Sequence, residues 1–135
     1  MRRLLLPLVS LPVLLAAQDA TNLFADLKVE RVAADLRFTE GPVWVRGGYW
    51  LFSDIPADRI YKLVPGGKPE VWREPSGQSN GLTLDRAGRL VACEHQTRRV
   101  TRTEPGGTLT VLASHHEGKA LNSPNDVAVR SDGSI

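Results

Sequence analysis

The sequence predicts an all-β fold of the β-propeller type, because the chain repeats with a period of 40 residues and glycine turns divide each repeat into short strand-like runs. The first two units keep the same register without a gap: Arg46 matches Arg86, and Pro65-Gly66-Gly67 matches Pro105-Gly106-Gly107. Turn glycines recur roughly every 20 residues, so each unit holds two hairpins and therefore four strands. In a propeller, equivalent positions of successive blades lie around a common axis.

Each predicted strand is an extended-favouring run between two turn signals. In the first unit we expect strands over residues 42–45, 49–53, 59–64 and 69–73. In the second unit we expect them over residues 82–85, 89–93, 99–102 and 109–112. Outside the first 17 residues, no segment keeps a helical period over 11 residues or more, which favours the all-β class.

A third unit begins at Asn125, and the sequence ends at Ile135. The propeller over residues 38–135 is therefore predicted to be incomplete, with two blades and the start of a third. Propellers close with at least four blades. We expect the sequence to be the front portion of a longer protein or a truncated gene model, and to be insoluble or partly unfolded when produced alone, because a sheet edge and an apolar face would be left open.

The N-terminus has the pattern of an export signal. Arg2 and Arg3 precede an apolar run that ends in small residues at Ala17, so residues 1–17 are predicted to be a signal peptide. The run is short for a membrane span, and the mature protein is expected to be periplasmic or secreted. The paired arginines leave both general secretion and twin-arginine export open. Residues 18–37 form an N-terminal segment in which residues 27–32 alternate like a strand that could close the ring.

Charge argues against a nucleic-acid partner. Removing residues 1–17 takes away Arg2 and Arg3 but no acidic residue, so the 17 basic and 15 acidic residues of the chain become 15 of each. A neutral surface of mixed sign favours neither nucleic acid nor an anionic membrane surface. The sequence does not indicate an oligomeric state.

The single cysteine and the tryptophans are expected to be structural. Cys93 lies in a strand-like run, where a buried cysteine acts as a small hydrophobe, and one cysteine excludes an internal disulfide. Trp44, Trp50 and Trp72 fall within predicted strands and are expected to fill space between stacked blades.

Three side chains that carry an oxygen atom occupy one recurring position. Glu40, Asn80 and Asn125 each lie eight residues before a turn glycine, just before the first strand of a blade. That strand is the innermost strand of a propeller blade, so the three side chains should converge at one end of the central channel. The alternative is that they make turn hydrogen bonds before a strand.

Carboxylate and amide oxygens suit a hard divalent cation, with Ca²⁺ favoured. Zinc is disfavoured because neither Cys nor His occupies the equivalent positions. Glu40 supplies only one negative charge, so we expect a further acid beyond Ile135, at the corresponding point of a later blade. That acid would be the general base or the nucleophile.

Other catalytic schemes find less support. Ser76 and Ser79 lie in no G-x-S-x-G elbow. His95, His115 and His116 lack metal-ligand spacing and are expected on the surface or in loops. Asp54 and Glu94 are equivalent to each other in the repeat, which favours a structural task such as binding loop amides.

Five segments together resemble the family of gluconolactonase, regucalcin (senescence marker protein) and luciferin-regenerating enzyme, and in particular its bacterial gluconolactonase-like branch. The resemblance covers about residues 29–135. It is carried by residues 38–44 (FTEGPVW), 51–56 (LFSDIP), 79–85 (SNGLTLD), 92–100 (ACEHQTRRV) and 121–127 (LNSPNDV).

The resemblance implies a six-bladed propeller with a divalent cation, usually calcium, near one end of the tunnel. It assigns the family's glutamate to Glu40, its asparagine facing metal and substrate to Asn80, and its later asparagine ligand to Asn125. Gln78 stands where some members place a substrate-facing arginine, so it is a candidate substrate-binding residue whose preference does not transfer. The family's catalytic aspartate has no counterpart in the sequence.

The leading functional hypothesis is metal-dependent hydrolysis of a small sugar lactone by the full-length protein, with the 135-residue chain inactive alone. One alternative keeps the metal site but acts on another ester or an organophosphate. A second alternative is a propeller that binds a ligand without turnover.

Overall fold

The structure is a computed structural model that describes residues 26–135, of which residues 31–135 form one compact unit. The predicted signal peptide, residues 1–17, lies outside the described residues, as do residues 18–25 of the N-terminal segment. Within the described part, no helix is long and apolar enough to cross a membrane. Export stays a prediction, because residues 1–17, on which it rests, lie outside the described part.

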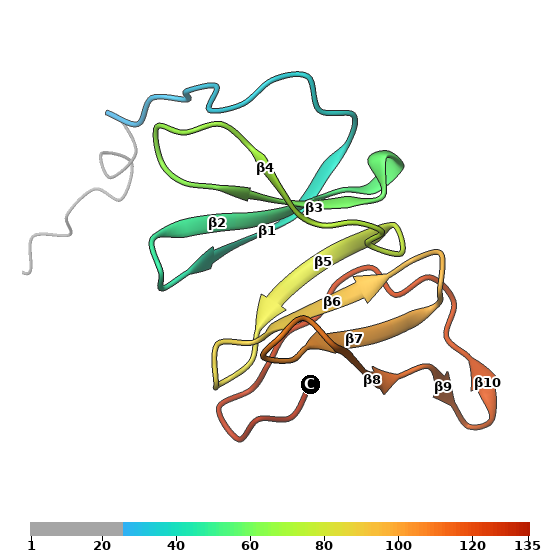
Figure 1. Ribbon diagram of the computed structural model, residues 1–135. Helices are drawn as coiled ribbons and strands as arrows, with labels where there is room; N and C mark the ends of the chain where they lie inside the picture. The colour runs from blue at the N-terminus through green and yellow to red at the C-terminus, as the bar shows by residue number, and fades with distance from the viewer. Residues whose placement is uncertain (1–25) are drawn as a thin grey trace, which may run out of the picture. The chain divides into compact units, whose positions relative to one another are not determined.

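Two four-stranded antiparallel sheets form the main part of the described fold (Figure 1). The first sheet, blade 1, has the order β1-β2-β3-β4, with β1 (Thr39–Val45), β2 (Tyr49–Asp54), β3 (Arg59–Leu63) and β4 (Glu70–Arg73). The second sheet, blade 2, has the order β5-β6-β7-β8, with β5 (Ser79–Leu84), β6 (Leu90–Glu94), β7 (Arg99–Thr103) and β8 (Leu109–Ala113). A short 3-10 helix, η2 (Ile55–Ala57), joins β2 to β3. The all-β prediction is confirmed.

Equivalent irregularities recur in both blades, as the sequence repeat predicts. The pairing of β3 with β4 shifts register between Ile60 and Tyr61, and that of β7 with β8 shifts between the equivalent residues Val100 and Thr101. Six of the eight predicted strands match the structure to within one residue at each end. β1 and β5 begin three residues earlier than predicted. Their first residues pair beyond a β-bulge, which interrupts the alternation of apolar and polar side chains on which the prediction depends.

The glycine turns of all three units form the same backbone hydrogen bond. The Gly48 N–H donates to Val45 O at 2.9 Å, and the Gly88 N–H donates to Asp85 O at 2.9 Å. In the third unit the Gly133 N–H donates to Arg130 O at 3.0 Å. All three glycines have positive φ, between 79° and 91°, a conformation that costs other residues free energy. The repeat therefore extends into the third unit, although residues 121–135 form no strand.

The two blades share one hydrophobic core. Leu51 and Ile60 of blade 1 pack against Leu82, Leu90 and Ala92 of blade 2, and all five are buried. Complete burial of one leucine or isoleucine side chain contributes roughly 1.5–3 kcal/mol. This cluster stacks the two sheets and fixes β1 beside β5.

The expectation for the tryptophans is correct for Trp72 alone, which packs against the shared core. Trp44 and Trp50 form an edge-to-face pair with ring centroids 5.1 Å apart and are 43% and 40% exposed. They alternate with Leu51 along the strands and so lie on the face of blade 1 that points away from blade 2. Further exposed apolar side chains on the described chain include Phe38, Val71 and Val111.

The predicted strand over residues 27–32 is absent from the structure, in which the first described strand is β1. A strand requires a partner backbone, and no described strand pairs with these residues. Their role in closing a ring stays a prediction. After β8 the chain forms a small hairpin from β9 (His115–His116) and β10 (Lys119–Ala120), which was not predicted from the sequence.

Candidate functional site

The two repeat-related site residues of blades 1 and 2 lie inside strands, and the prediction that they precede the strands is wrong. Glu40 is the second residue of β1 and Asn80 is the second residue of β5. Both stand at the bulged end of the strand, where pairing with the neighbouring strand shifts register. A bulge turns a side chain out of the regular alternation and is common beside functional sites. Asn125 lies in an irregular segment.

A glycine after each of the first two site residues contacts the next one. A Cβ on Gly41 would collide with the Asn80 carbonyl oxygen and would lie 2.8 Å from the Leu82 nitrogen. A Cβ on Gly81 would lie 2.7 Å from the Asn125 carbonyl oxygen, and the Gly81 N–H donates to that oxygen at 2.8 Å. Only glycine permits backbones to approach this closely. The same contact therefore links the first site residue to the second and the second to the third.

These contacts gather the three predicted residues around one cavity of about 330 Å³. Its walls are three equivalent tripeptides, residues 40–42, 80–82 and 125–127. Glu40, Asn80 and Asn125 thus converge, as expected, in the sense that all three line this cavity. Glu40 is half-buried, Asn80 is 6% exposed and Asn125 is exposed.

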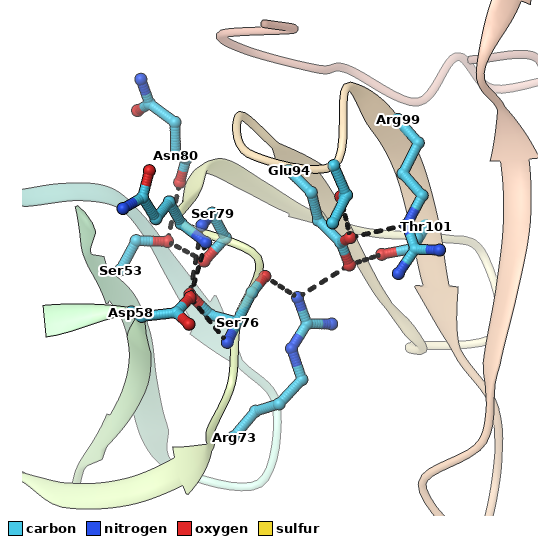
Figure 2. Close-up of polar contacts among 11 residues, drawn as sticks. Ser53, Asp58, Arg73, Ser76, Ser79, Asn80, Glu94, Arg99 and Thr101 are labelled. Carbon is cyan, nitrogen blue, oxygen red and sulfur yellow. Dashed lines mark hydrogen bonds and ion pairs between the residues drawn. The ribbon is translucent and has the colours of Figure 1, made fainter. Parts of the chain in front are cut away.

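Hydroxyl groups between the blades fix the backbone of Asn80. The Ser53 hydroxyl on β2 donates to the Asn80 carbonyl oxygen at 2.8 Å, and its oxygen lies 2.9 Å from the Ser79 hydroxyl oxygen. All three residues are buried. Figure 2 shows the side-chain amide of Asn80 pointing away from these hydroxyls. The backbone is therefore anchored on one side while the amide stays available on the other.

Asp58 organises the loop that leads into β5. Its Oδ1 accepts hydrogen bonds from the Ser76 N–H at 3.0 Å, the Ser76 hydroxyl at 3.1 Å and the Gln78 N–H at 2.6 Å (Figure 2). The Ser76 oxygen accepts in turn from the Ser79 N–H at 3.1 Å. A single carboxylate in blade 1 thus shapes the segment of blade 2 that carries Asn80.

Gln78, the other candidate substrate-binding residue, is not among the described residues that line the cavity. Its backbone has a φ of 49° and is fixed by the hydrogen bond to Asp58. Its binding role stays a prediction.

His95 lies in a turn, as expected, but it also contacts the predicted site residue Asn80. It follows β6 directly and is half-buried, and its Nε2 is 3.1 Å from the Asn80 Nδ2. His115 and His116 are exposed, as expected. His95 stands 15 residues after Asn80 and directly follows β6, whose last residue pairs with the first residue of β5.

Asp126 is a second carboxylate on the wall of the cavity, and it was not singled out from the sequence. Its Oδ1 accepts from the Val127 N–H at 2.8 Å and faces Gly81. A further acid was expected only beyond Ile135, whereas this one follows Asn125 directly. The expectation of a catalytic acid beyond Ile135 stays a prediction.

Asp54 and Glu94 are structural, as their equivalence in the repeat predicts. Asp54 accepts from the N–H groups of Arg37 at 3.0 Å and Phe38 at 3.1 Å, which confirms that it binds loop amides. Glu94 differs, because it accepts from side chains instead: Arg73 at 3.1 Å, Arg99 at 2.7 Å and Thr101 at 2.7 Å (Figure 2). Burial pushes the pKa of Glu94 upward, but these donors and Thr97 outweigh burial and hold the pKa below its ordinary value.

Cys93 is completely buried, which confirms its structural role. Burial, with a smaller contribution from the charge of Asp126, raises its pKa to about 11. A thiol with this pKa remains protonated at neutral pH and is a poor nucleophile.

The cavity suits a hard cation by the type of its donors. Its side chains offer oxygen atoms from two carboxylates and two amides, the set that calcium accepts. Among the described residues, no cluster of three or more His, Cys, Asp or Glu side chains is arranged to hold a metal. A larger hollow of about 480 Å³ lies on the face of blade 1 that points away from blade 2, and it is lined mainly by apolar residues such as Trp50, Phe52 and Leu63. Of the three predicted cation ligands, only Glu40 lines this hollow.

Comparison with known proteins places this geometry in a family. Residues 38–135 match the model of the SMP-30/gluconolactonase/LRE-like region. A gluconolactonase of Zymomonas mobilis subsp. mobilis is 30% identical over 122 residues, which cover 79% of the chain and 34% of that protein. The chain thus spans about a third of the length of this relative.

Solved structures show the same fold. A structural-genomics structure described as a candidate gluconolactonase superimposes with a TM-score of 0.72 at 40% identity, covering 77% of the chain and 37% of that protein. A gluconolactonase of Xanthomonas campestris superimposes with a TM-score of 0.72 at 33% identity, covering 76% of the chain and 35% of that protein. A virginiamycin B lyase of Staphylococcus aureus shares only the fold, with a TM-score of 0.56 at 15% identity over 70% of the chain and 32% of that protein. The chain has the β-propeller fold and belongs to the SMP-30/gluconolactonase/LRE-like family.

Proposed function

We propose that the whole protein, in which this chain is joined to the further length that its relatives have, hydrolyses a small sugar lactone at the cavity formed by residues 40–42, 80–82 and 125–127. The observation that carries the proposal is that three repeat-equivalent oxygen-bearing residues line one cavity. Membership in a family whose relatives include gluconolactonases supports a lactone as the substrate class.

We further propose a divalent cation at this cavity, with calcium favoured, held by Glu40, Asn80 and Asn125. Glu40 and Asp126 together carry two negative charges, which offset the charge of a divalent ion. The amides of Asn80 and Asn125 add neutral oxygen ligands without excess negative charge, as is common in calcium sites. When bound, the cation would polarise the lactone carbonyl and stabilise the negative charge that develops on its oxygen.

The residues of this chain would position the cation and the substrate more than they would transfer protons. The Ser53 hydroxyl holds the backbone of Asn80, which limits the positions that its side chain can take. Asn80 would also contact the substrate, and Gln78 is a second candidate for that contact. The acid that activates water is proposed to lie beyond Ile135, in a later blade. The 135-residue chain alone is therefore expected to be inactive.

Activity measurements on the whole protein test the proposal. Glucono-lactone hydrolysis should require calcium and stop in excess chelator. Glu40→Gln and Asn125→Ala should each lose most of the rate, on the order of 10²-fold or more. Matched controls are Glu70→Gln and Asn122→Ala, which make the same chemical changes at exposed residues outside the cavity. Full activity in excess chelator would contradict the proposal, and a panel with other esters and an organophosphate defines the substrate.

Export is part of the proposal and rests on the pattern of residues 1–17. Cell fractionation should find the protein in the periplasm or the medium, with an N-terminus near residue 18. A cytoplasmic protein that begins at Met1 would contradict export.

A further inference from the structure

His95 makes a defined contact with the candidate ligand Asn80. Its Nε2 lies 3.1 Å from the Asn80 Nδ2, and its backbone N–H donates to the Gln78 carbonyl oxygen at 3.3 Å. The second bond anchors the main chain of His95 to the residues that enter β5. The ring is therefore held against the amide from a neighbouring strand end rather than from a free loop.

The chemistry of the two groups fixes which atom donates. The amide Nδ2 carries two hydrogens and has no lone pair to offer, so the histidine Nε2 must accept. In this contact the His95 Nε2 therefore carries no proton. With Nδ2 turned to the histidine, the carbonyl oxygen Oδ1 is the amide atom left for a ligand in the cavity.

We propose that His95 is a positioning residue that orients the Asn80 amide so that its oxygen, and not its NH₂ group, faces a cation in the cavity; this inference rests on the proposed metal site. An asparagine amide has two ends of almost identical shape, and a rotation of 180° would present two hydrogens to the cation. While Nε2 is the ring nitrogen without a proton, that rotation is disfavoured, because it would place Oδ1 against a lone pair.

The repeat provides an internal comparison. Glu40 in blade 1 is equivalent to Asn80, and Ile55 in blade 1 is equivalent to His95, with the Ile55 N–H donating to Phe38 O at 3.1 Å in the same backbone contact. A carboxylate presents oxygen in either orientation and needs no partner to select it. The acceptor thus occurs beside the amide and is replaced by an apolar side chain beside the carboxylate.

Calcium titration of variants of the whole protein tests this role. His95→Leu keeps similar bulk but removes the acceptor, and should weaken calcium binding about 10-fold or more, as loss of a group that orients a ligand does. His95→Gln supplies an acceptor oxygen and should stay within about threefold of the original affinity. In an Asn80→Asp background, where no amide needs orientation, His95→Leu should change the affinity little. Thermal unfolding of each variant checks that it is folded.

The outcomes separate positioning from a general structural role. Equal weakening by His95→Leu in the original protein and in the Asn80→Asp background would overturn the inference, as would no weakening in either. A second measurement needs no metal: ¹⁵N NMR of the unliganded protein should show that the Nε2 of His95 carries no proton. A proton on Nε2 would overturn the inference. If the original protein takes up no calcium, the proposed function fails. The NMR result still decides whether His95 accepts a hydrogen bond from the Asn80 amide and so orients it.

Discussion

Arg73, the last residue of β4 in blade 1, donates from its Nη2 to Glu94 Oε1 at the end of β6 in blade 2, across 3.1 Å in a largely buried contact. Arg73 also donates to the Ser76 carbonyl oxygen at 2.7 Å, within the segment that links the two blades. The two blades are thus joined by a charged pair in addition to the apolar core, and this pair lies next to the loop that leads to Asn80.

Replacing Glu94 should destabilise the fold strongly. Glu94→Gln leaves Arg73 without its countercharge in a buried place, and loss of one partner of such a pair costs about 3–5 kcal/mol. The urea midpoint, followed by tryptophan fluorescence, should fall markedly. Glu70→Gln, on the exposed part of β4, should leave the midpoint almost unchanged. Equal midpoints for both variants would show that the pair contributes little.

The same residue predicts how stability depends on acid. Because the pKa of Glu94 is below its ordinary value in the folded protein, its contribution is complete above the unfolded-state pKa of about 4.3 and is lost as the pH falls through the folded-state pKa. Stability measured from pH 6 downward should therefore decline less steeply in Glu94→Gln than in the original protein below about pH 4.3. Parallel pH curves would contradict this assignment.

Gly41 should not tolerate a side chain. Gly41→Ala places a Cβ against Asn80 and Leu82 at a φ of 57°, which combines backbone strain of about 1–2 kcal/mol with overpacking of about 1–3 kcal/mol. The variant should lose stability and calcium affinity together. Gly66→Ala is the matched control, because Gly66 also has positive φ, 77°, but nothing lies within 4 Å of an added Cβ. If both variants lose the same stability, crowding at the cavity contributes nothing.

Ser53 should matter through the position of Asn80. Ser53→Ala removes the donor to the Asn80 carbonyl oxygen and leaves buried polar atoms unpaired, at a cost of about 1–3 kcal/mol. Calcium affinity should fall as well, because the backbone of a proposed ligand loses its anchor. Ser134→Ala, which removes an exposed hydroxyl that donates to Asp132, is the control and should do neither. An unchanged unfolding midpoint in Ser53→Ala would argue against the anchor.

The sequence predicts most of this fold because its signals are local. Each turn glycine fixes the end of a hairpin, so the strands between turns are placed to within a residue in most cases. β1 and β5 were predicted too short, since a bulge breaks the period-two pattern on which the prediction depends. The exposure of Trp44 and Trp50 was not predicted, because strand alternation does not show which face of a sheet a neighbour covers.

The lining of the cavity was predictable where the same position recurs in each repeat. Glu40, Asn80 and Asn125 share one register position, and the structure gathers them around one cavity. Asp126 and His95 were missed for a different reason. Their contacts, with Gly81 and with Asn80, join separate units or strand ends, and a repeat in one sequence does not show which side chains meet across them.

Calcium titration of the whole protein by calorimetry tests the central claim most directly. We predict that a single cation binds in the micromolar to millimolar range, that Glu40→Gln weakens binding by about 10-fold or more, and that Glu70→Gln binds as the original protein does. Calcium uptake that is unchanged in Glu40→Gln, or no uptake by the original protein at millimolar calcium, would contradict the claim that these repeated oxygens form a cation site.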